Sequence, residues 1–214
     1  MTLNCHQLAF SRAGQKIFTG LNFSLKPAEQ LLIIGPSGSG KSSLLAVLAG
    51  LQKPDHGRVE YDKLDLYQLK KSEIDLFRGQ NLGILLQNMP LIESLNLVQN
   101  LQLAGYFANF KISQERIFSL LERLNLLPKA KSLALNLSAG EKQRLALARA
   151  LIKQPKWLFC DEPTSNLDDH NCLKIIDLIK QEALTCQSSL IIITHDQRVK
   201  DSFKKSHILN LAAA

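Results

Sequence analysis

An apolar run leads directly into a glycine-rich loop in the stretch Leu31-Leu32-Ile33-Ile34-Gly35-Pro36-Ser37-Gly38-Ser39-Gly40-Lys41-Ser42. The four aliphatic residues are typical of a parallel strand that is covered on both faces. The loop matches the pattern G-x-x-x-x-G-K-[ST] at every required position. Apolar residues at helical spacing follow the loop, at Leu44, Leu45, Val47, Leu48 and Leu51. Strand, loop and helix in this order are the context that a phosphate-binding loop requires.

The residue types of this loop are those that hold a nucleotide. Glycines let backbone N–H groups close around phosphate oxygens, and the start of the following helix adds a favourable dipole potential. Lys41 is expected to reach the β- and γ-phosphates and to take part in catalysis, and the Ser42 hydroxyl is placed to bind Mg²⁺. The alternative is a flexible Gly/Ser turn. The residues expected to bind the nucleotide are Gly35, Pro36, Ser37, Gly38, Ser39, Gly40, Lys41, Ser42 and Ser43.

Two more strand-like runs end in polar residues, Trp157-Leu158-Phe159-Cys160-Asp161-Glu162 and Leu190-Ile191-Ile192-Ile193-Thr194-His195. In open α/β sheets, ligands bind at the carboxyl ends of the strands. Asp161 is therefore expected to hold Mg²⁺ through water, and Glu162 to orient and activate the attacking water. His195 is suited to contact the γ-phosphate or that water. The alternatives are an exposed acidic turn and a structural histidine.

The order of these runs predicts an α/β protein. Residues 3–61 have the pattern of short strands and turns around one helix, and residues 87–154 have the pattern of helices. A further helix between the last two strand-like runs carries one apolar stripe, made of Cys172, Ile175, Ile176, Ile179 and Ala183. This alternation favours a mostly parallel sheet with an inserted helical lobe.

A helix start is indicated at Leu137-Ser138-Ala139-Gly140-Glu141-Lys142-Gln143-Arg144. Ser138 is a favoured N-cap, and Glu141 stands three positions later, as in a capping box. An apolar helical run follows as far as Ile152 and ends before Pro155. Taken alone, this stretch predicts only the beginning of a helix.

Length and composition are those of one folded domain of 214 residues, with 45% hydrophobic and 21% charged residues. The longest aliphatic runs are strand-sized, far short of the roughly 20 residues of a membrane span. The N-terminus lacks the pattern of a secretory signal, which predicts a protein of the cytoplasmic side. The formal charge of +7 leaves nucleic acid, an anionic membrane and a solvated surface open. The scattered lysines and arginines favour the solvated surface.

The four cysteines, Cys5, Cys160, Cys172 and Cys186, show no C-x-x-C spacing. Cys160 lies inside an apolar run, and Cys172 lies on the apolar stripe of a predicted helix. Reduced thiols that pack in the interior are therefore expected rather than a metal site or a disulfide.

The motifs and their order resemble the ATP-binding cassette (ABC) ATPases over essentially the whole chain. The resemblance implies a P-loop NTPase of α/β class, with a mostly parallel RecA-like core sheet, an N-terminal antiparallel β subdomain and an inserted α-helical subdomain. It implies one ABC ATPase domain over residues 1–211, in which 1–86 and 155–211 form the ATP-binding core with the β subdomain. Residues 87–154 would form the helical signature subdomain. The final Ala212-Ala213-Ala214 is set aside as a candidate cloning remnant.

The resemblance also assigns roles to residues outside the loop. Gln87 matches the Q-loop glutamine, which senses Mg²⁺ and nucleotide, takes part in catalysis and transmits to a membrane partner. Ser138 and Gly140 match the signature residues that contact the γ-phosphate held by another copy in a head-to-tail dimer. Asp168 matches the D-loop residue that helps to organise the dimer interface beside the nucleotide. The alternatives are an ordinary polar loop residue at Gln87 and a simple helix cap at Asp168.

Two features depart from the family pattern. Ala139 and Glu141 replace the usual glycine and glutamine of the signature, and their small size and capping ability predict that both are tolerated. The usual adenine-stacking aromatic is not obvious. Arg12 occupies its position and Phe10 is nearby, so the stacking is expected from the Arg12 guanidinium plane, from Phe10, or to be weak.

The implied function is that of an ATPase subunit that uses ATP and Mg²⁺. It would dimerise on ATP, as a homodimer or heterodimer, and drive a separately encoded transmembrane permease that it contacts near the Q-loop, on the cytoplasmic face of the membrane. Residues 65–78, 81–91 and 161–168 look like the branch that contains lipoprotein-release, macrolide-export and cell-division ATPases.

Two other classes of function fit the sequence less well. A soluble ABC ATPase acting on nucleic acid or ribosomes would typically carry a second cassette, long coiled coils or zinc-binding cysteines, so no nucleic acid is expected. A P-loop kinase for small molecules would leave residues 137–144 and His195 without a role.

Overall fold

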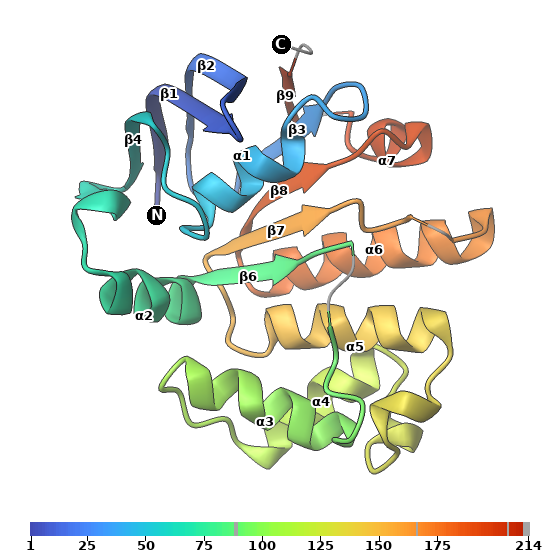
Figure 1. Cartoon of the computed structure of the whole chain (residues 1–214). Helices are drawn as coiled ribbons and strands as arrows, with labels where there is room; N and C mark the ends of the chain where they lie inside the picture. Colours follow the sequence, from blue (N-terminus) through green and yellow to red (C-terminus); the bar gives the residue numbers. More distant parts are fainter. Residues whose placement is uncertain (88–89, 166, 205, 212–214) are drawn as a thin grey trace.

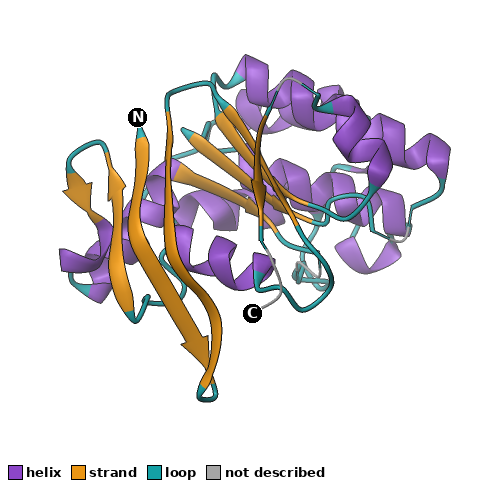
Figure 2. Cartoon of the chain, turned by 90° about the horizontal axis from the view of Figure 1, so that it is seen from above, coloured by secondary structure: helices purple, strands orange, loops and turns teal. Residues whose placement is uncertain are grey.

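The framework of the fold is made of two β-sheets, one with parallel and one with antiparallel strands (Figures 1 and 2). The computed structural model describes residues 1–87, 90–165, 167–204 and 206–211. A five-stranded parallel sheet has the strand order β6-β7-β8-β3-β9, and a four-stranded antiparallel sheet has the order β2-β1-β4-β5. The strands are β1 (Leu3–Arg12), β2 (Gln15–Leu25), β3 (Gln30–Ile34), β4 (His56–Tyr61), β5 (Leu64–Asp65), β6 (Leu82–Leu85), β7 (Trp157–Asp161), β8 (Ser189–Ile193) and β9 (His207–Asn210).

Helices cover the parallel sheet on both faces, which is why every residue of β7 and β8 is buried and most are apolar. On one face, α1 (Lys41–Leu48) packs in a cluster with Trp157, Phe159, Ile191 and Ile193. On the other face, α5 (Ala139–Leu151) and α6 (Asp169–Thr185) pack in a cluster with Leu158, Cys160, Leu190 and Ile192. The α/β class and the mostly parallel core sheet that the sequence predicts are both confirmed.

The parallel register brings three functional loops to one edge of this sheet. Ile33 pairs with Ile193, and Asp161 pairs with the same residue from the other side. The glycine-rich loop follows β3, Glu162 follows β7, and Thr194 and His195 follow β8. The three segments therefore leave the sheet together, although more than 120 residues separate the first from the second in the sequence.

The antiparallel sheet starts with a hairpin of two strands that are 10 and 11 residues long, longer than the short strands that the sequence predicts. Positive φ values of 50° and 79° at Ala13 and Gly14 make the turn. The register of the two strands shifts at several points along the hairpin. The hairpin reaches the glycine-rich loop, where Ile17 lies against Gly40.

Between β6 and β7 the chain forms helices, as the sequence predicts for residues 87–154. The helices of this segment before α5 are α3 (Leu97–Phe107) and α4 (Gln114–Arg123), with short 3₁₀ segments at Leu127–Lys129 and Ala134–Asn136. Outside it lie α2 (Lys71–Asn81), α7 (Gln197–Ser202) and a 3₁₀ segment at Leu66–Gln68. The sequence does not predict α2 and α7, because α2 has no buried residue and so leaves little apolar pattern, and α7 spans only six residues.

The cysteines behave as interior thiols. Cys5, Cys160 and Cys172 are buried and Cys186 is half-buried, and all four are free thiols. Burial raises the pKa of the Cys5 and Cys160 thiols, which keeps them protonated and unreactive at neutral pH. The predicted packing role is confirmed for Cys160 and Cys172.

Helices long and apolar enough to span a bilayer are not found in the described part of the chain. The predicted cloning remnant, Ala212-Ala213-Ala214, lies outside the described residues.

Candidate functional site

A cavity of about 570 Å³ lies at the carboxyl edge of the parallel sheet. The glycine-rich loop lines this cavity together with Gln87, Glu162 and His195. Its lining residues are Arg12, Ile17, Gly35, Pro36, Ser37, Gly38, Gly40, Lys41, Ser42, Ser43, Gln87, Glu162 and His195. The structure thus brings together residues from four segments that sequence analysis assigned to one phosphate site.

Backbone geometry explains two of the glycines in the loop. Gly40 is the N-cap of α1 and has a φ of 87°, and a Cβ atom there would lie 2.1 Å from Ile17 Cγ2. Gly38 has a φ of 80° and faces open space. Since residues with side chains rarely adopt such φ values, glycine is needed at both positions for the backbone to curve around an anion.

The Lys41 ammonium is held by its own loop. Its Nζ donates to the carbonyl oxygens of Gly35 and Pro36, at 2.9 Å and 2.7 Å, and the side chain is largely buried. The ammonium group therefore lies at the cavity wall, and it forms no salt bridge with a carboxylate of the described residues. A phosphate group entering the cavity would meet a cation that is already in place.

Asp161 carries a buried carboxylate oxygen that is suited to bind a cation. Its Oδ1 atom has no hydrogen-bond partner among the described residues. Desolvation raises the pKa of this carboxyl group, and the neighbouring Ser42 side chain opposes the rise. A buried carboxylate oxygen next to a serine hydroxyl is the hard oxygen donor set that Mg²⁺ prefers, usually with substrate phosphates and water as further ligands. The residues present therefore fit a bound Mg²⁺.

Glu162 is held in an unusual backbone conformation, with a φ of 48°. Its backbone N–H donates to the Ile193 carbonyl at 2.9 Å, which ties the end of β7 to β8. One carboxylate oxygen, Oε1, lies 2.7 Å from His195 Nδ1, and Oε2 accepts from Thr194 Oγ1 at 3.4 Å. Non-glycine residues at positive φ are uncommon and gather at functional sites, where the surrounding structure enforces them.

Gln87 stands in an exposed turn after β6 and faces two cavities. The first is the phosphate-site cavity, and the second, of about 330 Å³, lies between this turn and the start of α5. Gln143 of α5 closes the second cavity by donating to the carbonyl of Pro163. Gln87 therefore lies at the junction between the cavity, the helical segment and the loop after Glu162.

Ser138, Gly140 and Asp168 do not line the phosphate-site cavity of their own chain. The predicted capping box at Ser138 is confirmed: its backbone N–H donates to Glu141 Oε2 at 2.9 Å, and its side chain accepts from the Glu141 N–H. Asp168 is the N-cap of α6 and accepts from the Asn171 N–H at 2.9 Å. Both segments thus begin helices, with Ser138 and Asp168 exposed to solvent.

The two candidates for stacking on a base differ in position. Phe10 is only 8% exposed, and its ring stacks on Phe18 with the ring centroids 5.9 Å apart. Arg12 is exposed and lines the phosphate-site cavity. The expectation that Phe10 could supply the stacking is therefore wrong, because its place in the β1–β2 alternation turns the ring into the core.

Sequence reasoning missed a set of polar residues just behind the cavity. Thr164 and Arg198 both donate to Asp196, and Thr194 contacts Glu162. The only signal in the sequence was the N-cap pattern at Asp196, which accepts from the Arg198 N–H at 2.9 Å. That pattern indicates the start of a helix and says nothing of the distant Thr164.

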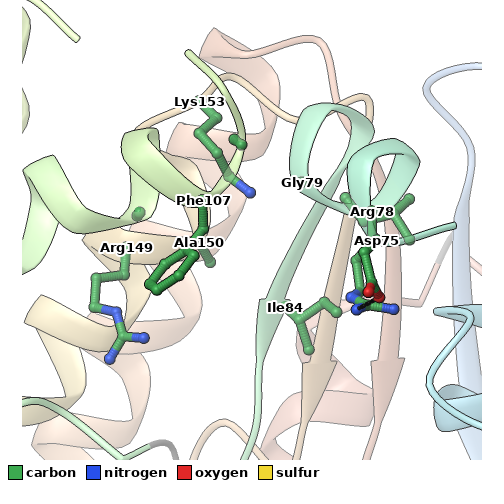
Figure 3. A pocket seen from close by; sticks show the side chains of 11 residues that line it. Asp75, Arg78, Gly79, Ile84, Phe107, Arg149, Ala150 and Lys153 are labelled. Carbon is green, nitrogen blue, oxygen red and sulfur yellow. Dashed lines mark hydrogen bonds and ion pairs between the residues drawn. The ribbon is translucent and has the colours of Figure 1, made fainter. Parts of the chain in front are cut away.

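A separate pocket of about 450 Å³ lies among α2, β6, α3 and α5 (Figure 3). In Figure 3, Phe107, Arg149 and Lys153 lie on one side of the pocket, opposite Asp75, Arg78 and Ile84. Burial, with a smaller contribution from Arg78, lowers the pKa of Lys153 to about 8. Phe107, which lines the pocket, and its neighbour Tyr106 are both more than 70% exposed. Apolar side chains and three cations, Arg78, Arg149 and Lys153, thus line the same pocket.

The chain is similar in sequence to ATP-binding proteins of ABC transporters. The family model described as ABC transporter matches residues 18–165. The lipoprotein-releasing system ATP-binding protein LolD of Legionella pneumophila (strain Paris) is 33% identical over 197 residues, which cover 91% of this chain and 87% of that protein. LolD of Buchnera aphidicola subsp. Schizaphis graminum (strain Sg) is 36% identical over 213 residues, covering 97% and 92%.

A solved structure shares the fold over nearly the full length. It is the dimeric post-hydrolysis state of the ATP-binding cassette MJ0796 bound to ADP and Pi. The two folds agree with a TM-score of 0.86 and 28% sequence identity, over 99% of this chain and 96% of that one. The chain described here belongs to the ABC transporter family and is one of its ATP-binding cassettes.

Proposed function

We propose that this chain binds and hydrolyses ATP as the energy-supplying subunit of an ABC transporter that acts in lipoprotein release or export. One observation carries the chemistry: the glycine-rich loop, Gln87, Glu162 and His195 line a single cavity at the carboxyl edge of the parallel sheet, and Asp161 ends β7 directly before Glu162. The names of the LolD relatives from Legionella and Buchnera support the choice of process.

In this proposal the loop holds the triphosphate of ATP. Backbone N–H groups of the loop, other than at Pro36, would face the phosphate oxygens, and Lys41 would leave the Gly35 and Pro36 carbonyls to contact the β- and γ-phosphates. Ser42, Asp161 and Gln87 would hold Mg²⁺, which neutralises charge that develops on the phosphates. Arg12 lies at the cavity wall, where its guanidinium plane can stack on the base.

Glu162 is proposed as the base of the reaction. Its carboxylate orients the attacking water and accepts a proton from it as the water oxygen bonds to the γ-phosphorus and the bond to the ADP oxygen breaks. The contact with His195 Nδ1 at 2.7 Å holds one carboxylate oxygen, and the imidazole, which lines the cavity, would lie beside the γ-phosphate. The products are ADP and inorganic phosphate.

Ser138, Gly140 and Asp168 are proposed to act on the nucleotide of another copy. Since they lie outside the cavity of their own chain, any contact with phosphate has to come from a second cassette, either identical or related. The capped start of α5 offers N–H groups and a positive dipole end to such a phosphate. Residues 87–154 would move as the signature subdomain, joined to a core of residues 1–86 and 155–211.

The transmembrane partner is proposed to bind near Gln87, on the cytoplasmic side of the membrane. The pocket among α2, β6, α3 and α5 offers apolar side chains and the exposed Phe107 (Figure 3). Tyr106, next to Phe107, is also exposed, and Gln87 lies in the turn after β6. Movement of the partner would then reach the cavity through the turn that carries Gln87.

Release of phosphate from ATP tests the proposed chemistry. The wild-type chain should release phosphate in a Mg²⁺-dependent reaction, and Glu162→Gln should bind ATP with unchanged affinity while its rate falls by a factor of at least about 10². Normal turnover by Glu162→Gln would remove Glu162 from the role of base. Transfer of the phosphoryl group to a small-molecule acceptor instead of water would exclude an ATPase.

A further inference from the structure

A single carboxylate joins the loop that carries His195 to the loop that follows Glu162. Thr164 Oγ1 donates to Asp196 Oδ2 at 2.9 Å, and Cys172 Sγ lies 3.8 Å from the same oxygen. Thr164 is only 2% exposed, and the Asp196 side chain is 14% exposed. Charge-assisted hydrogen bonds in such a sheltered place are stronger than their counterparts in water.

Arg198 extends this connection towards Asp168. Its Nε and Nη2 atoms donate to the two oxygens of Asp196, at 3.0 Å and 2.7 Å. Its third nitrogen, Nη1, donates to Asp169 Oδ1. Asp169 is the first residue of α6 and directly follows Asp168. The planar guanidinium group therefore fixes the start of α6 relative to the loop that contains His195.

A second route leads from Asp196 to the reacting groups. The Asp196 backbone N–H donates to Thr194 Oγ1 at 2.9 Å, and Thr194 Oγ1 contacts Glu162 Oε2. Asp196 also follows His195 directly in the chain. Neither Asp196 nor Arg198 lines the cavity, so both can act on the reaction only through other residues.

We propose that Asp196 and Arg198 are positioning residues that couple Thr164 and the start of α6 at Asp169 to Glu162 and His195. A second cassette that contacts Asp168 would thereby set the geometry of the water-activating carboxylate and of the imidazole. This inference rests on the proposed function, because it gives Glu162, His195 and Asp168 their roles. It adds a path by which dimer contact regulates the rate without changing how ATP is held.

The helix-capping role of Asp196 does not account for these contacts. Capping of α7 uses Oδ1, which accepts from the Arg198 N–H. Oδ2 instead accepts hydrogen bonds from Thr164 Oγ1 and Arg198 Nη2. Thr164 belongs to the loop after β7, whereas Arg198 belongs to α7. Asp196→Asn keeps an oxygen for the cap and loses the charge that holds Arg198. Thr164→Val removes only the hydroxyl at nearly constant shape, and Thr164→Ser restores it.

The test compares these variants of the full chain in steady-state ATP hydrolysis, with its transmembrane partner present if the chain alone is slow. Thr164→Val and Asp196→Asn should each lower kcat by about tenfold or more, with KM for ATP within about twofold of wild type. Thr164→Ser should recover most of the rate. In the double variant the loss should stay well below the product of the two single losses, because both changes break one connection.

A readout without turnover covers variants that hydrolyse too slowly to measure. In a Glu162→Gln background, Thr164→Val should still form the ATP-dependent dimer, since nucleotide binding and the signature surface are intact. Wild-type kcat in Thr164→Val, an equal loss in Thr164→Ser, or a change confined to KM would overturn the positioning role. Failure of Glu162→Gln itself to stop turnover would instead overturn the proposed function, so the two failures are told apart.

Discussion

His195 Nδ1 lies 2.7 Å from Glu162 Oε1, although the two residues are 33 positions apart and follow different strands. The contact exists because β7 and β8 are parallel neighbours that end at the same edge, with Asp161 paired to Ile193. A carboxylate and an imidazole in contact beside a phosphate-binding loop form a site that can activate water.

Replacement of His195 tests this pair directly. We expect His195→Ala to lower kcat by a factor of about 10² while leaving ATP affinity unchanged, because the imidazole contacts Glu162 and not the loop of residues 35–43. Phosphate release and nucleotide titration measure the two quantities. His56→Ala, at an exposed position on β4, is the matched control. Equal rates in both variants would show that His195 is only structural.

Asp161 should govern the response to Mg²⁺. Its buried, unpartnered oxygen predicts that Asp161→Asn raises the Mg²⁺ concentration for half-maximal hydrolysis by about tenfold, since the amide keeps the shape and loses the charge. Removal of Mg²⁺ with a chelator should stop hydrolysis in every variant. Asp177→Asn, on the exposed side of α6, should titrate like wild type. An unchanged Mg²⁺ dependence in Asp161→Asn would contradict this assignment.

Arg12 should contribute to base binding. Arg12→Ala is expected to weaken ATP binding by roughly two- to fivefold, the size of a partly exposed cation–π contact, and Arg12→Tyr to restore it. Titration with a fluorescent ATP analogue measures both. Lys16→Ala lies on the same hairpin outside the cavity and serves as control. If Arg12→Ala binds as tightly as wild type, the base is held by other contacts.

The capping box at Ser138 should make the stability of the fold depend on pH through Glu141. Lys129 and then the Ser138 N–H lower the pKa of Glu141 from 4.5 to about 2. Its stabilising effect is therefore complete above pH 4.5 and disappears as the pH falls towards 2. Glu141→Gln keeps the cap without a titrating group, so its loss of stability in that range should be smaller than that of wild type. Denaturant unfolding at several pH values measures this difference, and parallel curves would contradict it.

Much of the fold follows from local pattern. Features that depend on residues close together in the sequence can be predicted from those residues alone. They include the apolar runs of β3, β7 and β8, the glycine-rich loop and the capping box at Ser138. The α2 helix was missed because none of its residues is buried, so no apolar stripe marks it.

What could not be predicted depends on contacts between distant segments. The bond from Thr164 to Asp196 spans 32 positions, and the two residues meet only because β7 and β8 lie side by side. The burial of Phe10 follows from its pairing with Phe18 across the hairpin, whose register shifts at that point. A sequence shows which residues carry polar groups but does not show these registers.

The most direct test of the account concerns the second phosphate surface at Ser138. Sedimentation of Glu162→Gln with and without ATP should show a monomer that becomes a dimer when ATP is added. Addition of Ser138→Arg should abolish the dimer and leave ATP binding by the loop of residues 35–43 intact, because the arginine occupies the surface that faces the other copy. Ala139→Gly should change little. An ATP-dependent dimer that forms equally well with Ser138→Arg would contradict the account and reduce this stretch to the cap of α5.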